Sequence, residues 1–232
     1  MAIVDESVVL GTGNTIGPNA VISGNVRIGD NNWIGPHAVI GTPGQVRGNP
    51  HPTPWCGDVT SGGVVIGSDN IIREFATIHS SLGGLTAVGS NCYLMAQAHV
   101  PHDATVENDV TLCNSVQLGG HTIVQRGANI GFGTAVHQYT VIGAGVMIGM
   151  NTVVKGSVPP FALFFGNPGR IRDANVVGLR RMGYKDETIS RISNIHKLGA
   201  LDQLLEIFPQ EMGMYLDAVA TMQGRVNARQ VT

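Results

Sequence analysis

Residues Val88–Val154 read VGSNCYLMAQAHVPHDATVENDVTLCNSVQLGGHTIVQRGANIGFGTAVHQYTVIGAGVMIGMNTVV, with an aliphatic residue at every sixth position. These positions are Val88, Leu94, Val100, Val106, Leu112, Leu118, Val124, Ile130, Val136, Ile142, Ile148 and Val154. A period of six fits neither an α-helix nor an ordinary strand, and it is typical of a hexapeptide β-helix. In such a solenoid each short strand points one branched side chain inward. Three strands close one triangular coil, so a coil takes three repeats of six residues.

Two shorter runs with the same spacing precede this stretch, Leu10–Ile40 and Ile66–Ile78. The 32 glycines suit tight corners, and few aromatic (5%) and charged (13%) residues suit a core of Val, Ile and Leu. A glycine-rich β-sandwich or a low-complexity segment would not hold this register. We therefore expect an all-β fold, a parallel β-helix. Parallel crossovers are normally right-handed, but hexapeptide solenoids are the known exception, so we expect a left-handed coil.

The register also predicts how the chain is divided. We expect the β-helix over residues 1–170 and a small helical cap over residues 171–232. Two slips in the spacing predict a Pro/Gly-rich loop at about 41–65 and a shorter excursion at about 79–87. Loops beside a regular scaffold often carry function. The consecutive prolines 159 and 160 stop the repeat.

Helical spacing of apolar residues then indicates the elements of the cap. We expect helices over about 174–183, from Lys185 onward, over Leu201–Phe208, and from Pro209 to about Met222, with a frayed end after that.

The composition excludes several classes of protein. A net charge of −2 argues against nucleic-acid binding. The three cysteines form no CxxC pair and predict no disulfide framework. The first residues, MAIVDESVVLGTG, lack the pattern of a signal peptide, and no apolar stretch is long enough to span a membrane. We therefore expect a cytoplasmic protein without a transmembrane segment.

Four of the eight histidines have a regular placement. When the residue numbers of His99, His102, His121 and His137 are divided by 18, the length of one coil, the remainders are 9, 12, 13 and 11. These values predict one corner of the triangle in successive coils, which stack about 4.8 Å apart. The four imidazoles should therefore line one groove.

Three chemistries could use such a groove. Neutral imidazoles bind zinc, but the closest pair, His99 and His102, is three residues apart and no thiolate or carboxylate completes a set, so we expect no metal and no cofactor. A histidine could instead be the general base for acyl transfer from a thioester, since its ordinary pKa is close to neutral. A non-catalytic scaffold would not need clustered imidazoles.

Several motifs make a family resemblance specific. These motifs are IREFATIH (72–79), AHVPHDATV (98–106), GGH (119–121), GTAVHQY (133–139), VPPF (158–161), GNP (166–168) and NVVGLRRMGY (175–184). With them, the sequence strongly resembles the UDP-N-acetylglucosamine acyltransferases of lipid A synthesis. The resemblance implies transfer of a 3-hydroxyacyl group from acyl carrier protein, the co-substrate, to the sugar 3-hydroxyl of a UDP-sugar. It also implies a homotrimer with grooves between subunits.

The same resemblance implies roles for particular residues. His102 would be the catalytic base, and a backbone N–H near Gly120 would be the oxyanion donor. A carboxylate such as Asp103 could orient the base, although the sequence does not identify which one does. The expected substrate-binding residues are Arg47, His79, His99, His121, His137, Gln138, Asn175 and Arg181. Residues Met147, Met150 and Pro168 are expected at the acyl-chain pocket, where Met150 would shorten the chain that fits.

The sequence also departs from the family pattern. Residues 44–47 read GQVR where the family has QDLK, so Arg47 would replace the lysine and Asp58 could replace the aspartate. Val177, Met182 and Pro168 stand where the family has Glu, Arg and His. These differences keep two alternatives open: an acyl- or acetyl-CoA-dependent N-acyltransferase that acts on an amino sugar, and a non-catalytic protein that binds nucleotide sugars.

Overall fold

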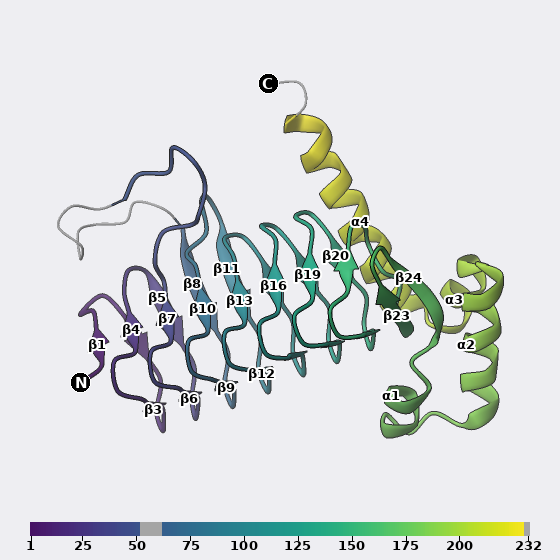
Figure 1. Ribbon diagram of the computed structural model, residues 1–232, viewed down its shortest axis with the longest axis horizontal. Coiled ribbons are helices and arrows are strands. Elements are labelled where there is room, and N and C mark those ends of the chain that lie inside the picture. Colours follow the sequence, from purple (N-terminus) through teal and green to yellow (C-terminus); the bar gives the residue numbers. More distant parts are fainter. Residues whose placement is uncertain (52–61, 230–232) are drawn as a thin grey trace.

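The computed structural model describes residues 1–51 and 62–229, and it is a three-sided parallel β-helix followed by helices (Figure 1). Sheet A contains β1 (Ile3–Val4), β4 (Val21–Ile22), β7 (Val39–Ile40), β10 (Thr77–Ile78), β13 (His99–Val100), β16 (Gln117–Leu118), β19 (Ala135–Val136) and β22 (Val153–Val154). Sheet B contains β2 (Val9–Leu10), β5 (Val26–Ile28), β8 (Gly63–Ile66), β11 (Leu85–Val88), β14 (Thr105–Val106), β17 (Ile123–Val124) and β20 (Val141–Ile142).

Sheet C closes the triangle. It contains β3 (Thr15–Ile16), β6 (Trp33–Ile34), β9 (Ile71–Ile72), β12 (Tyr93–Leu94), β15 (Thr111–Leu112), β18 (Asn129–Ile130), β21 (Met147–Ile148), β23 (Ala162–Gly166) and β24 (Gly169–Ala174). Strands pair across coils with partners 18 residues apart, as Thr105 does with Ile123. The predicted coil length is therefore confirmed.

The core consists of the aliphatic residues that recur every six positions. Eleven of the largest fully buried side chains lie on these positions: Ile22, Ile34, Ile40, Ile66, Ile72, Ile78, Leu94, Leu112, Ile130, Ile142 and Ile148. Leu10, in the first coil, remains 37% exposed because no coil precedes it. The parallel β-helix is confirmed, while its left hand stays a prediction.

Both loop excursions leave the solenoid at the corner between sheets A and B. One follows β7 and returns at β8, and the other follows β10 and returns at β11. Residues 52–61 of the first loop, including Asp58, lie outside the described residues. The two loops therefore extend over the same edge of the prism, which Figure 1 shows as its upper edge.

A β-hairpin separates the repeats from the helices, and the sequence analysis missed it. Strand β23 continues sheet C in parallel with β21, and β24 returns antiparallel to β23. The first helix, expected over about 174–183, therefore begins slightly later, because β24 continues to Ala174. The six-residue spacing stops before this hairpin, so the pattern gave no signal for it.

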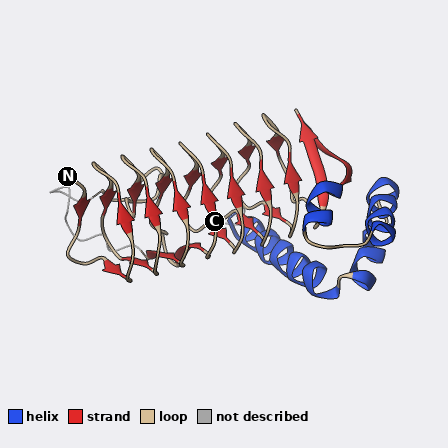
Figure 2. Ribbon diagram, turned by 90° about the horizontal axis from the view of Figure 1, so that it is seen from below, coloured by secondary structure: helices blue, strands red, loops and turns tan. Residues whose placement is uncertain are grey.

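Four helices follow: α1 (Val176–Arg181), α2 (Asp186–Leu198), α3 (Leu201–Ile207) and α4 (Pro209–Arg229). The predicted frayed end after Met222 is wrong, because α4 continues to Arg229. Helix α4 folds back along the solenoid (Figure 2), where Met212, Tyr215 and Met222 are buried in a cluster that includes Val141 of sheet B. Within the described ranges, no helix is both long and apolar enough to cross a membrane.

Candidate active site

The corner between sheets A and B carries a column of polar side chains. Asp103, His121 and Tyr139 occupy the same position in three successive coils, with backbone φ of 59°, 60° and 60°. The ring of His121 stacks on Tyr139 at 4.6 Å and meets the ring of His102 edge-on at 5.2 Å. The three column residues leave the same remainder when divided by 18, so the spacing already contained a signal for this column.

His102 and Asp103 form a hydrogen-bonded pair at this corner. Nδ1 of His102 lies 2.8 Å from Oδ2 of Asp103, which also accepts the N–H of Leu82 at 3.2 Å. The backbone N–H of Asp103 donates to the hydroxyl of Thr86 at 2.9 Å. The sequence left open which carboxylate orients the imidazole, and the structure places Asp103 in contact with it.

The charge of Asp103 follows from these contacts. Burial alone would raise the pKa of its carboxyl group, but the hydrogen bonds from His102 and Leu82 and the nearby His121 hold this pKa below its ordinary value. An ionised carboxylate accepts a proton-bearing Nδ1, which leaves Nε2 of the neutral imidazole as the acceptor. Such an arrangement is suited to general-base chemistry.

Nε2 of His102 faces a cleft of about 470 Å³. A Cβ atom added to Gly120 would lie 2.7 Å from this nitrogen, so only glycine leaves the approach open. The cleft is lined by Gln45, Val46, Arg47, His99, Pro101, His102, Leu118, Gly120 and Gln138. The structure thus brings together five predicted site residues, namely Arg47, His99, His102, Gly120 and Gln138.

The long loop packs directly on His102. A Cβ atom added to Gly44 would lie 2.8 Å from Cβ of His102, and the carbonyl of Gly44 accepts from the side chain of Asn49 at 3.0 Å. This packing carries Arg47 to the cleft. The sequence analysis missed the contacts of Gly44, Leu82 and Thr86, because Gly44 and Leu82 lie in loops without a period and Thr86 lies in β11 directly after one of these loops.

His79 lies next to His99 rather than in the lining of the cleft. The two rings meet edge-on at 4.8 Å, and Nδ1 of His99 lies 2.7 Å from the hydroxyl of Thr77. Burial, together with the neighbouring His99 and His102, lowers the pKa of His79 to about 4. Burial also lowers the pKa of His99. Both rings are therefore neutral near pH 7.

The expectation that four histidines line one groove is only partly right. His121 packs between the rings of His102 and Tyr139. His137 lines a second pocket of about 380 Å³, beside Lys155 and the end of α4. Gln138 is common to the lining of both spaces. The four side chains do not share one groove because the turn at the corner points successive residues in different directions.

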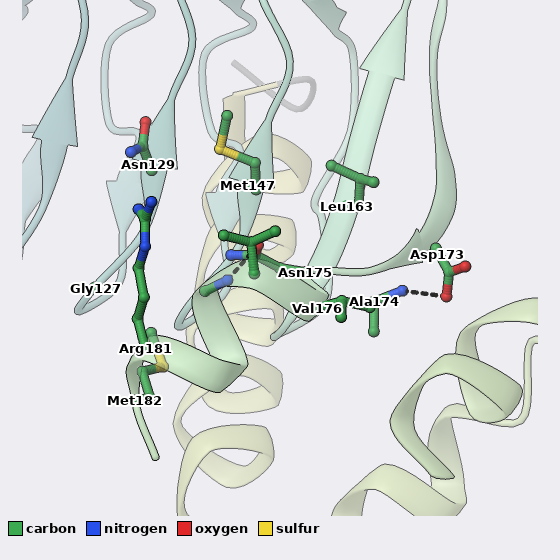
Figure 3. Close-up of a pocket in the computed structure, with 12 residues that line it drawn as sticks. Gly127, Asn129, Met147, Leu163, Asp173, Ala174, Asn175, Val176, Arg181 and Met182 are labelled. Carbon is green, nitrogen blue, oxygen red and sulfur yellow. Dashed lines mark hydrogen bonds between the residues drawn. The ribbon is translucent and has the colours of Figure 1, made fainter. Parts of the chain in front are cut away.

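Asn175 and Arg181 lie elsewhere, in a pocket of about 590 Å³ on sheet C (Figure 3). The side chain of Asn175 caps α1 by accepting the N–H of Gly178 at 3.0 Å, and it donates to the carbonyl of Gly145 at 3.0 Å. Figure 3 shows Arg181 extending along the pocket toward Asn129. In a single chain, these two residues are separate from the cleft.

The three residues expected at the acyl-chain pocket are not brought together. Met147 lines the pocket on sheet C, whereas Met150 and Pro168 are outside its lining. The side chain of Met150 is 67% exposed. Pro168 lies in the turn between β23 and β24.

The corner between sheets A and B contains the elements of a possible metal site. One ligand atom from each of His102, Asp103 and His121 lies within 4.8 Å of the others. The statement that no carboxylate completes a set is therefore wrong, because the corner brings Asp103 to both rings. The expectation of no bound metal stays a prediction, and elemental analysis of the purified protein tests it.

The fold and the site define the class of hexapeptide-repeat β-helix proteins with a histidine-based site. Residues 6–42 match the family model described as bacterial transferase hexapeptide (six repeats), and residues 158–207 match that of Udp N-acetylglucosamine O-acyltransferase; Domain 2. Among solved structures, UDP-N-acetylglucosamine acyltransferase from Campylobacter jejuni is 31% identical, with a TM-score of 0.67 over 84% of this chain and 81% of that one. The chain belongs to the UDP-N-acetylglucosamine acyltransferase family.

Other relatives agree. LpxA from Acinetobacter baumannii has a TM-score of 0.77 and 27% identity over 95% of both chains. The acyl-[acyl-carrier-protein]–UDP-N-acetylglucosamine O-acyltransferase of Synechocystis is 40% identical over 137 residues, 58% of this chain and 50% of the relative. The enzyme of that name from Pseudomonas fluorescens is 37% identical over 171 residues, 67% of this chain and 66% of the relative. The matched stretch thus spans about half to two thirds of these curated relatives.

Proposed function

We propose that the protein transfers a 3-hydroxyacyl group from an acyl carrier protein thioester to the 3-hydroxyl of UDP-N-acetylglucosamine, with His102 as general base. The observation that carries this proposal is the His102–Asp103 pair, whose free Nε2 faces a cleft. The family relationship supports the choice of donor and acceptor. We further propose that the protein works in the cytoplasm without a cofactor.

The reaction follows from this geometry. Nε2 of His102 takes the proton of the acceptor hydroxyl, whose oxygen attacks the thioester carbonyl. The resulting oxyanion would accept the backbone N–H of Gly120. As the carbon–sulfur bond breaks, the imidazolium returns the proton to the leaving thiolate, so the carrier departs as a thiol. Asp103 stabilises the imidazolium between these steps.

A homotrimer would join the two separate halves of the site. His102 lines the cleft, and Arg181 lines the separate pocket on sheet C. If both residues contact one substrate, Arg181 must come from a neighbouring subunit whose sheet C lies against the cleft. Exposed apolar side chains on sheet C, Trp33 at 38% and Ile71 at 44%, are available for such an interface. A mass of three chains in native mass spectrometry would support this assembly, and a monomer would contradict it.

The carrier protein would meet a basic part of the cap. Arg170, Arg172 and Lys185 are exposed, and the guanidinium of Arg172 lies 5.2 Å from the ring of Phe165. Arg180 pairs with Asp186 at 3.0 Å, so it contributes less free charge. Guanidinium groups suit an acidic partner such as acyl carrier protein.

Turnover with defined substrates tests the function. We expect transfer from 3-hydroxyacyl carrier protein to UDP-N-acetylglucosamine, measured as the acylated nucleotide sugar by mass spectrometry. A panel with CoA thioesters and a 3-amino UDP-sugar separates O-acylation from N-acylation. Nucleotide-sugar binding without any turnover would favour the non-catalytic alternative.

The acyl-chain pocket is tested by Met150→Gly. We propose that the exposed Met150 side chain limits the acyl chain at a subunit interface, so its removal should favour longer chains. For donors that are several methylene groups longer, kcat/KM should rise by 10-fold or more, because each buried CH₂ contributes about 0.8 kcal/mol. The measurement is kcat/KM against donor length, and a profile that does not move would contradict the assignment.

A further inference from the structure

The short loop over residues 79–84 contacts both the long loop and Asp103. It joins β10 to β11 at the corner where His102 and Asp103 lie. The long loop, which brings Arg47 to the cleft, leaves the solenoid at the same corner. A displacement of the short loop would therefore change the surroundings of the cleft on two sides.

Two contacts connect the short loop to the long loop. The backbone N–H of Ser80 donates to the carbonyl of Thr42 at 2.8 Å. A Cβ atom added to Gly44 would lie 3.1 Å from Cδ2 of Leu82, so the leucine side chain packs against this glycine. The position of the long loop at the cleft therefore depends on where Leu82 lies.

Leu82 also contacts the carboxylate beside His102. Its backbone N–H donates to Oδ2 of Asp103 at 3.2 Å, and the same oxygen lies 2.8 Å from Nδ1 of His102. Leu82 thus contacts the long loop with its side chain and Asp103 with its backbone.

The hydroxyl of Ser81 fixes the shape of the short loop. It donates to the carbonyl of Gly84 at 2.6 Å and accepts the N–H of Gly63, the first residue of β8, at 3.1 Å. Ser81 is fully buried. A buried N–H that loses its partner is costly, so removal of this hydroxyl should displace the loop at the adjacent Leu82.

We propose that Ser81 is a positioning residue for the transfer reaction: its buried hydroxyl fixes the short loop, so that Leu82 keeps both the Asp103 carboxylate and the long loop in place beside His102. This inference rests on the proposed function and adds a residue to it. Ser81 acts through Leu82 and does not need to touch either substrate.

The two contacts of Leu82 predict two separate kinetic effects. Its N–H orients Asp103, and loss of this bond should lower kcat because the carboxylate is then held less firmly. Its side chain supports Gly44, and loss of this contact should raise KM for the acceptor because Arg47 then leaves the cleft more readily. Ser81 fixes the loop that makes both contacts, so its hydroxyl should affect kcat and KM together.

The kinetic test compares Ser81→Ala and Leu82→Ala with wild type, and Ser80→Ala is the matched control. Ser80 is a buried serine of the same loop, and its backbone N–H keeps the bond to Thr42 in the variant. In Ser81→Ala, we expect kcat to fall by about 10-fold, as is typical for loss of a hydrogen bond to a charged group, and KM for UDP-N-acetylglucosamine to rise severalfold. Leu82→Ala keeps the N–H to Asp103, so KM should rise more than kcat falls. Ser80→Ala should match wild type.

A second measurement does not depend on turnover. Amide hydrogen exchange, read by NMR, should be faster at Leu82 in Ser81→Ala than in wild type or Ser80→Ala. The N–H of Asp103 is the internal reference, because it donates to Thr86 and should keep its protection. A change confined to the short loop separates positioning from a general loss of stability.

The outcomes separate this inference from the proposed function. If wild type has no transferase activity but exchange at Leu82 responds to Ser81→Ala as described, the proposed function fails and the positioning contact stands. In an active enzyme, kinetic constants of Ser81→Ala equal to those of Ser80→Ala would overturn the inference. Unchanged exchange at Leu82, or faster exchange throughout the solenoid, would also overturn it, because the hydroxyl would then either not hold the loop or only stabilise the fold.

Discussion

His102→Ala is expected to lower kcat by about 10²- to 10⁴-fold, the range typical for loss of a general base. Among the residues that line the described cleft, the imidazole of His102 is the only side chain whose nitrogen contacts a partly buried carboxylate, that of Asp103 at 2.8 Å. Without it, the acceptor hydroxyl keeps its proton and attacks the thioester poorly. Steady-state kinetics with the carrier thioester and UDP-N-acetylglucosamine give the measurement.

Two further variants keep this prediction specific. Gly120→Ala retains His102 but places a Cβ atom 2.7 Å from its Nε2, so it should also impair turnover. His51→Ala removes an exposed loop histidine and should leave kcat unchanged. Equal turnover in His102→Ala and wild type, with a folded protein, would rule out His102 as the base.

The second large effect concerns stability, at the fully buried Asn70. Its Oδ1 accepts the N–H of Cys92 at 2.7 Å, and its Nδ2 donates to Gly89 and Asn32. Asn70→Ala would remove the side-chain partner of the Cys92 N–H and of the Gly89 carbonyl, at about 1–3 kcal/mol for each group, whereas Oδ1 of Asn32 keeps the backbone N–H of residue 70 at 3.0 Å. We therefore expect a loss of about 3–5 kcal/mol, seen as a decrease of about 10 °C in Tm.

An exposed asparagine of the same solenoid provides the control. Asn114 lies on a corner with its side chain in solvent, so Asn114→Ala should change the free energy of unfolding by less than about 0.5 kcal/mol. Similar Tm values for Asn70→Ala and Asn114→Ala would show that the buried asparagine contributes little.

Much of the candidate site could be predicted because it follows the coil. His99 and His102 lie near one corner as their remainders indicate, and both line the cleft. His121 lies at the same corner, against the ring of His102, but His121 and His137 are outside the lining of this cleft, since residues only a few places apart on a tight corner point in different directions. The prediction could not separate Asn175 from the cleft, because the position of α1 on sheet C depends on the intervening hairpin.

The sequence by itself determined the β-helix, because each inward side chain contacts its equivalents 18 residues away and this requirement repeats along the chain. Only the tertiary structure decided which groups surround His102 and Asp103. Leu82 reaches Asp103 from a loop that has no period, and Arg225 reaches His121 across 104 residues of sequence. Such contacts depend on how whole elements pack, and one sequence contains no local pattern that records them.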